Sequence, residues 1–453
     1  MEDMESTTTS GPNWMMVIYH LPFLLQLGLL HQKFQSKTFE RHQGSLRLIR
    51  IGLVPINIFL GVEIMYKFTM KPLTRRGPLN LQFACWTAHL VMRSIEWGFQ
   101  STFNGDPTFQ LRPEFHPKHQ ILQSQEKEKE NENEITENLL NLKPQVIREK
   151  TQKRIMTVTK TLRGINYVWG WKGRKQEKPT LSQTLRLTLI SHVGQVMGVI
   201  PLVMIRDHGS PTNALLALGV PNFIGLRIVA EGLGTFAWGL LCVYGMEFGF
   251  CLLTLMAHLI NFFSENVWEL PCSFMQWWDL RLFVPVFGSP LSANSLVSLW
   301  SYHWHQVYRR SFKIVGAQPA TILATKLGLS IKFKRLFGLL GAFIVSAIFH
   351  EVAIKWTAQS SHPSAYQFFH QFPGSLLYFL MQPLGIIVEP YIIPLIPKWM
   401  GGGSLWVLVF TLITAQQFRD QYAFHDRVID DTYPPFRDWP WIGVLWPSSI
   451  MQS

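Results

Sequence analysis

Two histidines lie where an ionisable side chain is unusual. His350 lies in an apolar run, Phe337–Trp356, in which the strongly polar groups before the end are His350 and Glu351. His305 lies earlier, in a segment rich in tryptophan and tyrosine. A charge at membrane depth costs about 2.5 kcal/mol or more, so such a group usually faces protein or a water path. His350 is therefore a candidate for chemistry.

Proton transfer is the chemistry that a buried histidine supports. Burial disfavours imidazolium, so we expect His350 to stay neutral near pH 7 and to keep a lone pair that accepts a proton. A neutral histidine in a dry cavity is a good general base. A second interpretation stays open, in which His350 only hydrogen-bonds to a neighbouring helix. Glu351 points about 100° away around the helix, so we expect it to orient a loop or cap a polar network.

The segment around His305 has aromatic residues at helical spacing. In SLWSYHWHQVYRRSF these are Trp300, Trp304 and Tyr308, which predicts an amphipathic helix in the membrane interface with its rings at headgroup level. His305 and Arg309 share a neighbouring face. The segment is thus either an interfacial anchor with incidental histidines or part of a site with His350.

Membrane spans must position these histidines. Of the 453 residues, 47% are apolar and 15% are charged, which predicts an all-α, polytopic integral membrane protein. We predict about eight transmembrane helices, each crossing about 30 Å of hydrocarbon, around an intramembrane reaction chamber. The eight windows are residues 14–30, 48–66, 79–99, 185–205, 234–262, 336–356, 374–396 and 403–417.

Two long connections divide the chain. Residues 101–183 contain QEKEKENENE, a charged run that cannot bury enough apolar surface to order itself and is expected to be a solvated loop. Residues 264–335 contain the tryptophan-rich segment. We therefore predict N-terminal transmembrane segments (1–100), a charged cytosolic loop (101–183) and a core (184–453).

The formal net charge of +12 does not indicate nucleic acid. The cations cluster in loops beside apolar segments, where they orient the spans and attract anionic lipid headgroups. Residues 148–178 hold ten Lys and Arg and residues 309–335 hold seven, so we place both on the cytosolic side. The uncharged residues 357–373 then fall on the lumenal side. The Lys and Arg of residues 67–76 disagree with this orientation.

Three elements, in order along the chain, carry a resemblance to a known family. They are RGINYVWGW (163–171), FGSPLSANSLVSLWSYHWHQVYRRSF (287–312) and an apolar helix with FHE (349–351). Over about residues 160–400 the chain resembles the wax-synthase-like branch of the membrane-bound O-acyltransferases. Fungal members of that branch include acetyltransferases that act on terpenoid and meroterpenoid alcohols. Position 303 is histidine where relatives usually have arginine.

The resemblance implies transfer of an acyl group, most simply acetyl from acetyl-CoA, to a hydroxyl of a lipophilic terpenoid in fungal secondary metabolism, in the endoplasmic reticulum membrane. It identifies His350 with the family's catalytic histidine and His305 with its second polar position, an asparagine or histidine. His350 would accept the hydroxyl proton and His305 would support the developing oxyanion. Acyl-CoA is a co-substrate, and no bound cofactor is expected. Further substrate-binding candidates are Trp304, Gln306, Asn294 and Arg309.

Other classes of protein compete with this interpretation. A di-iron oxygenase needs HxxxH and HxxHH clusters that supply about eight ligands, whereas His303, His305 and His350 are too few and wrongly spaced. The four cysteines show no CxxC spacing, so we expect no metal site. A transporter would also place polar residues at mid-membrane, but inverted repeats are not visible. A wax ester synthase, which joins long-chain acyl-CoA to a fatty alcohol, is the enzymatic alternative.

Overall fold

The structure is a computed structural model of the chain, and it describes residues 14–30, 42–67, 73–99, 178–268, 270–275, 278–358, 374–425 and 429. All regular secondary structure in these residues is helical, which confirms the predicted all-α class. The main helices are α1 (Trp14–Gly28), α2 (Gln43–Lys67), α3 (Leu73–Phe99), α6 (Leu181–His208), α7 (Pro211–Ala217), α8 (Leu226–Asn266), α9 (Cys272–Met275), α10 (Leu296–Ser298), α11 (Arg309–Phe312), α12 (Gln318–Lys326), α13 (Ile331–Ala358), α15 (Gly374–Ile392), α16 (Gly403–Thr414) and α17 (Gln416–Arg419).

All eight predicted windows coincide with helices, but fewer of them meet the requirements for a span. Within the described residues, five helices are long and apolar enough to cross a membrane: α2, α6, α8, α13 and α15. Helices α1 and α16 are apolar but shorter, and α3 does not qualify. The chain is a multi-pass membrane protein, and the count of eight spans is not confirmed. The RGINYVWGW element lies outside the described residues.

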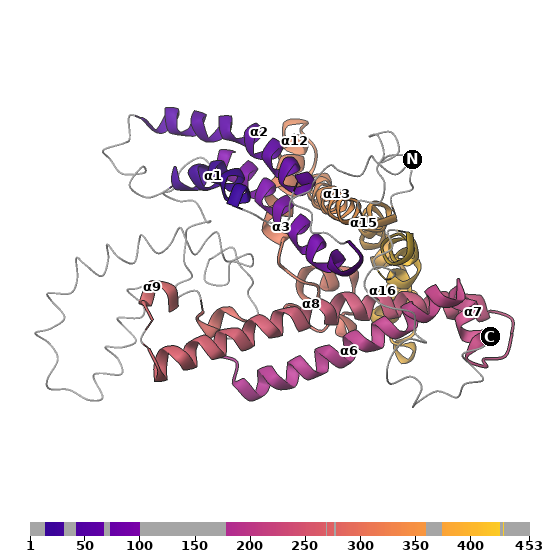
Figure 1. The fold of residues 1–453 in the computed structure, drawn as a ribbon. Coiled ribbons are helices and arrows are strands. Elements are labelled where there is room, and N and C mark those ends of the chain that lie inside the picture. The colour runs from indigo at the N-terminus through magenta and orange to yellow at the C-terminus, as the bar shows by residue number, and fades with distance from the viewer. Residues whose placement is uncertain are drawn as a thin grey trace, which may run out of the picture.

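Helix α13 contacts several other elements. It packs against α3, α12, the π-helical turn η7 (Lys313–Ala317) and α15. Helices α1, α2 and α3 form one group, and the two long helices α6 and α8 run side by side as another (Figure 1). The crossing of η7 and α13 is close because Gly316 meets Gly341: a Cβ on Gly341 would lie 2.5 Å from the carbonyl oxygen of Gly316.

Small residues allow α6 and α8 to approach closely. Gly194 and Gly198 are four residues apart in α6, the spacing that brings helix backbones together in membranes. A Cβ on Gly198 would lie 2.6 Å from the backbone nitrogen of Leu241 and 2.8 Å from the carbonyl oxygen of Ala237. Backbone atoms cannot move away from such a clash by rotating about a bond, as the end of a flexible side chain can.

Replacement of Gly198 by isoleucine is therefore expected to force the two helices apart. Overpacking of this kind costs about 1–3 kcal/mol, so we expect a lower thermal midpoint of the purified protein in detergent. The matched control is Gly239→Ile, because Gly239 lies on α8 with no atom within 4 Å of an added Cβ. Equal midpoints for the two variants would contradict the close approach at Gly198.

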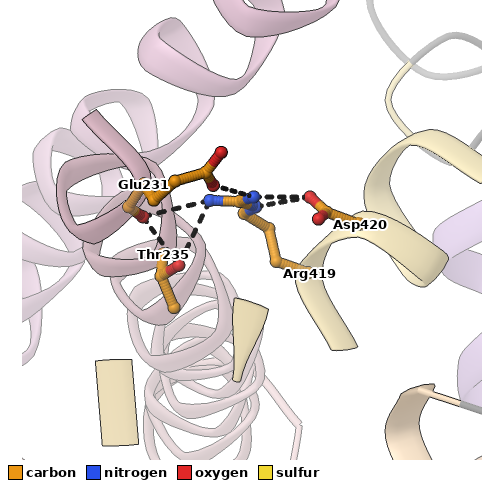
Figure 2. Close-up of polar contacts among 4 residues, drawn as sticks. All are labelled: Glu231, Thr235, Arg419 and Asp420. Carbon is orange, nitrogen blue, oxygen red and sulfur yellow. Dashed lines mark hydrogen bonds and ion pairs between the residues drawn. The ribbon is translucent and has the colours of Figure 1, made fainter. Parts of the chain in front are cut away.

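An ion cluster joins the C-terminal helices to the start of α8 (Figure 2). Arg419 is 1% exposed, and its guanidinium lies between Glu231 and Asp420, with contacts of 2.7 Å to Oε2 of Glu231 and 2.6 Å to Oδ1 of Asp420. It also donates to the carbonyl oxygen of Glu231 and, over 3.2 Å, to the hydroxyl of Thr235. These bonds satisfy a buried cation that would otherwise be costly.

Candidate active site

His350 lies on α13, one helical turn after Ser346. Its Nδ1 lies 2.7 Å from the carbonyl oxygen of Ser346. A carbonyl oxygen can only accept, so Nδ1 carries the proton and donates it, and Nε2 of the neutral ring keeps the lone pair. The helix backbone thus selects the tautomer in which Nε2 is the proton-accepting atom.

Aromatic rings fix the plane of this imidazole. Phe379 of α15 stacks on His350 with ring centroids 4.1 Å apart and an angle of 21° between the planes. Phe349 meets it edge-on at 5.2 Å, and Phe312 lies 6.4 Å away. The ring is therefore held by α13, by α15 and by the segment that precedes η7.

Glu351 anchors the start of α15 to α13. Its carboxylate is 3% exposed and accepts hydrogen bonds from the hydroxyl of Ser375, from the backbone N–H of Leu376 over 3.2 Å and from Nε2 of Gln421 over 3.1 Å. The first backbone N–H groups of a helix have no partner inside the helix, and a carboxylate there is favoured. Glu351 therefore caps a polar network beside His350, and α15 in turn carries Phe379.

The tryptophan-rich segment is not the single amphipathic helix that its spacing predicted. A π-helical turn, η6 (Leu299–His303), ends at His303, and residues 304–308 form an irregular turn before α11. Gln306 ends the helix because its Nε2 donates to the carbonyl oxygens of Trp300 and Trp304, over 3.2 and 2.8 Å. π-Helical turns are rare and occur often at functional sites.

Trp300 packs against α13 and α15. Its Nε1 donates over 3.2 Å to Oε1 of Gln382, a fully buried residue of α15. Its ring lies 5.7 Å from Phe343 and 6.0 Å from Phe379. The indole thus faces the protein interior and the residues around His350.

The structure brings both candidate catalytic histidines onto one aromatic cluster. His305 lies 6.1 Å from Tyr308, Tyr308 lies 4.7 Å from Phe349, and Phe349 lies 5.2 Å from His350, all between ring centroids. Two rings therefore separate the imidazoles along this path. Burial raises the pKa of the Tyr308 hydroxyl well above its ordinary value, so this phenol, in the loop between spans, keeps its proton.

The four candidate substrate-binding residues take different positions. Trp304 packs between Trp300 and His305, on the same aromatic cluster. Gln306 is 6% exposed and its amide holds the turn. The other two, Arg309 and Asn294, are exposed, and they interact with neighbours in the chain. Of the four, Trp304 is the one placed against a candidate catalytic histidine.

His303 closes the loop that precedes it. Its Nδ1 donates to the carbonyl oxygen of Gly288, and the N–H of Gly288 donates over 2.9 Å to the carbonyl oxygen of His303. A side chain on Gly288 would meet the carbonyl oxygen of Tyr302 at 2.6 Å. These two hydrogen bonds give His303 a structural role at the base of the loop.

Helix α3 supplies polar residues that the sequence analysis did not assign to the site. His89 is 4% exposed, its Nδ1 lies 3.2 Å from the hydroxyl of Ser311, and its ring lies 5.4 Å from that of Tyr308. Glu96 pairs with Arg93 and with Arg310. The spacing of His89, Arg93 and Glu96 by four and three residues puts them on one helix face, a pattern that could have predicted an inward-facing polar side.

Glu96 is the one anion of this cluster and lies between Arg93, which is buried, and Arg310, whose side chain is 10% exposed. Replacement by glutamine leaves Arg93 and Arg310 without a countercharge from this position, and loss of one partner of a buried pair costs about 3–5 kcal/mol. We expect the Glu96→Gln protein to accumulate poorly and to melt well below the parent. The control is Glu265→Gln, at the exposed end of α8. The measurement is thermal unfolding in detergent, and equal midpoints would contradict the buried pairing.

The predicted reaction chamber is not confirmed. Two hollows stand out in the described part of the chain, and neither borders His350 or His305. One, of about 630 Å³, lies near Asp207 and Leu218, and the other, of about 640 Å³ and almost wholly apolar, lies between α1 and α2. The described residues hold no group of three or more His, Cys, Asp or Glu side chains that could bind a metal ion.

The chain is similar to a known protein family over part of its length. A model described as the membrane bound O-acyl transferase family matches residues 283–371, which include the tryptophan-rich segment, η7, α12 and the helix that carries His350. No curated protein matches the chain. The match covers 89 of the 453 residues, so over this stretch the chain is similar to the family. The apolar helices long enough to cross a membrane agree with this similarity to a membrane-bound family.

Proposed function

From the match to the membrane bound O-acyl transferase family, we propose that this protein transfers an acetyl group from acetyl-CoA to a hydroxyl of a lipophilic terpenoid or meroterpenoid alcohol. The observation that carries the proposal is the imidazole of His350, whose Nδ1–H is bound to the Ser346 carbonyl. A fixed Nε2 lone pair inside the membrane-spanning part is what deprotonation of an apolar alcohol requires.

The reaction proceeds by direct transfer. His350 Nε2 accepts the hydroxyl proton while the alcohol oxygen attacks the thioester carbonyl. The tetrahedral intermediate collapses, the carbon–sulfur bond breaks, and the leaving thiolate takes a proton, so that the products are an ester and free coenzyme A. No nucleophile of the protein is needed. His305 donates a hydrogen bond to the oxyanion, a contribution of the kind that oxyanion donors make.

The two substrates reach the site from different phases. Coenzyme A is anionic through its phosphates and arrives from the cytosol, where the basic residues that follow the tryptophan-rich segment attract it. Those residues include Arg309 and Lys313, on α11 and η7. The alcohol arrives from the bilayer of the endoplasmic reticulum. Phe379 covers one face of His350, so the acceptor takes its place beside the imidazole by displacing this ring.

Product analysis in a living host tests the substrate class. Cells that express the protein are fed terpenoid alcohols, sterols and long-chain fatty alcohols, and their lipid extracts are examined by mass spectrometry. We expect acetate esters of terpenoid alcohols that are absent from cells with the empty vector. Long-chain wax esters in their place would assign the protein to the wax ester synthases, and no new ester from any class would overturn the proposal.

A further inference from the structure

Two buried carboxylates in the membrane-spanning helices have no part in the mechanism above. One is Glu247 of α8, which is 8% exposed. Between Glu231 and Glu265 it is the one Asp, Glu, Lys or Arg of the helix. About 20 residues of a helix cross the hydrocarbon. Every stretch of that length that lies between Glu231 and Glu265 includes Glu247. We therefore place its carboxylate within the apolar layer.

The carboxylate of Glu247 binds the backbone of the tryptophan-rich connection. Its oxygens accept the N–H of Val286, over 2.9 and 3.2 Å, and the N–H of Phe287 over 3.2 Å. The ring of Phe287 then meets Trp304 edge-on at 5.2 Å and His305 at 5.8 Å. Phe287 thus supplies one of the bound N–H groups and also carries the ring that contacts a candidate catalytic histidine.

Glu389 of α15 does the same at a second point. It is 5% exposed, and its carboxylate accepts the N–H of Leu296, the first residue of α10. Helix α10 leads directly into η6, which carries Trp300. The segment 286–304 is therefore bound through its backbone at two points. The start of the segment, at residues 286 and 287, is bound to α8, and its middle, at residue 296, is bound to α15.

Both attachments meet two requirements at once. A carboxylate in an apolar layer is costly unless hydrogen bonds satisfy it. Irregular backbone at membrane depth is tolerated only where protein groups satisfy its N–H and C=O groups. The bonds from Val286, Phe287 and Leu296 do both, which explains why single carboxylates occur in the apolar stretches of α8 and α15.

We propose that Glu247 and Glu389 are positioning residues, whose carboxylates hold the segment 286–304 by its backbone and thereby set the place of His305 relative to His350. The hold on the segment stands on the hydrogen bonds alone. Its consequence for turnover rests on the proposed acyl transfer. The experiment therefore has one arm that measures the segment and one that measures turnover.

The first arm measures how often the segment opens. Val286 is 8% exposed and Ala293 is 2% exposed, so each serves as a reporter when replaced by cysteine in a chain whose four native cysteines are alanine. The rate of labelling by N-ethylmaleimide follows the population of opened states. We expect Glu247→Ala to raise it about tenfold at position 286, and Glu389→Ala to do so at position 293.

Matched variants separate this hold from a general loss of stability. Glu231→Gln removes a partner of Arg419 at the far end of α8 and should leave both labelling rates at the parental value. Glu247→Gln keeps one acceptor oxygen in the same shape, so its labelling rate should lie between those of the parent and Glu247→Ala. If Glu247→Ala does not accumulate, the glutamine variant takes its place. Parental labelling rates in the carboxylate variants would overturn the proposal.

The second arm measures acyl transfer by the same proteins. A displaced His305 supports the transition state less, so we expect kcat to fall about tenfold or more in both alanine variants while the KM for the acyl donor stays close to that of the parent. Glu247→Gln should recover part of kcat, and Glu231→Gln should keep it. Faster labelling with an unchanged kcat would overturn the positioning role. Failure of the proposed function itself would appear as an inactive parent with the labelling pattern intact.

Discussion

Replacement of His350 by alanine is expected to lower kcat by about 10²–10⁴-fold, the contribution of a well-placed general base. The protein should still accumulate in membranes, because the ring of His350 is held by contacts with Phe379 and Phe349 that a smaller side chain loosens without leaving a buried charge. Initial rates of ester formation at saturating donor and acceptor give kcat, and immunoblots of the membrane fraction give the amount of protein.

A second histidine in a span provides the control for this variant. His258 of α8 lies 3.1 Å from the hydroxyl of Thr184, away from the aromatic cluster, so His258→Ala should keep the parental kcat. His350→Gln is informative as well, because glutamine can hydrogen-bond but cannot serve as a base near pH 7. Parental turnover in His350→Ala would remove this residue from the mechanism.

Replacement of His305 by alanine is expected to lower kcat by about 10²–10³-fold, the cost of losing one oxyanion donor. His305→Asn should restore part of this loss, because an asparagine amide can donate the same hydrogen bond. The KM for the acceptor should change less than kcat, since the bond strengthens only as charge develops on the oxygen. Steady-state kinetics on purified protein in detergent separates the two parameters.

His192→Ala is the matched control for this second variant. His192 is exposed on α6 and its ring lies 5.2 Å from Phe248, so it retains an aromatic contact but lies outside the site. If His305 were only an interfacial anchor, His305→Ala and His192→Ala would have the same kcat, and His305→Asn would restore nothing. That result would exclude the oxyanion role.

Helices were the part of the fold that sequence alone could predict. An apolar run of sufficient length has few conformations other than a helix in lipid, so each of the eight windows is helical in the structure. Whether a helix crosses the membrane is harder to predict, as α3 demonstrates. Its His89, Arg93 and Glu96 face neighbouring elements, and a polar face of this kind depends on partners such as Arg310 that lie more than 200 residues away.

The local form of the tryptophan-rich segment could not be predicted for the same reason. Its 3.6-residue periodicity indicated one helix, but Gln306 takes the carbonyl oxygens that the next turn would use. The orientation of the Trp300 indole is set by a hydrogen bond to Gln382, a residue distant in the sequence. The lone carboxylates Glu247 and Glu389 are visible in the sequence, whereas the backbone N–H groups that they accept become apparent only in three dimensions.

Ester formation by the purified protein in liposomes tests the central claim most directly. The protein is supplied with acetyl-CoA labelled in the acetyl group and with a terpenoid alcohol in the bilayer, with a metal chelator present and no ion gradient. We predict labelled acetate ester and one free coenzyme A thiol for each ester formed, with neither product above background in His350→Ala. No ester from the parent protein, or an ester yield that His350→Ala leaves unchanged, would contradict the account.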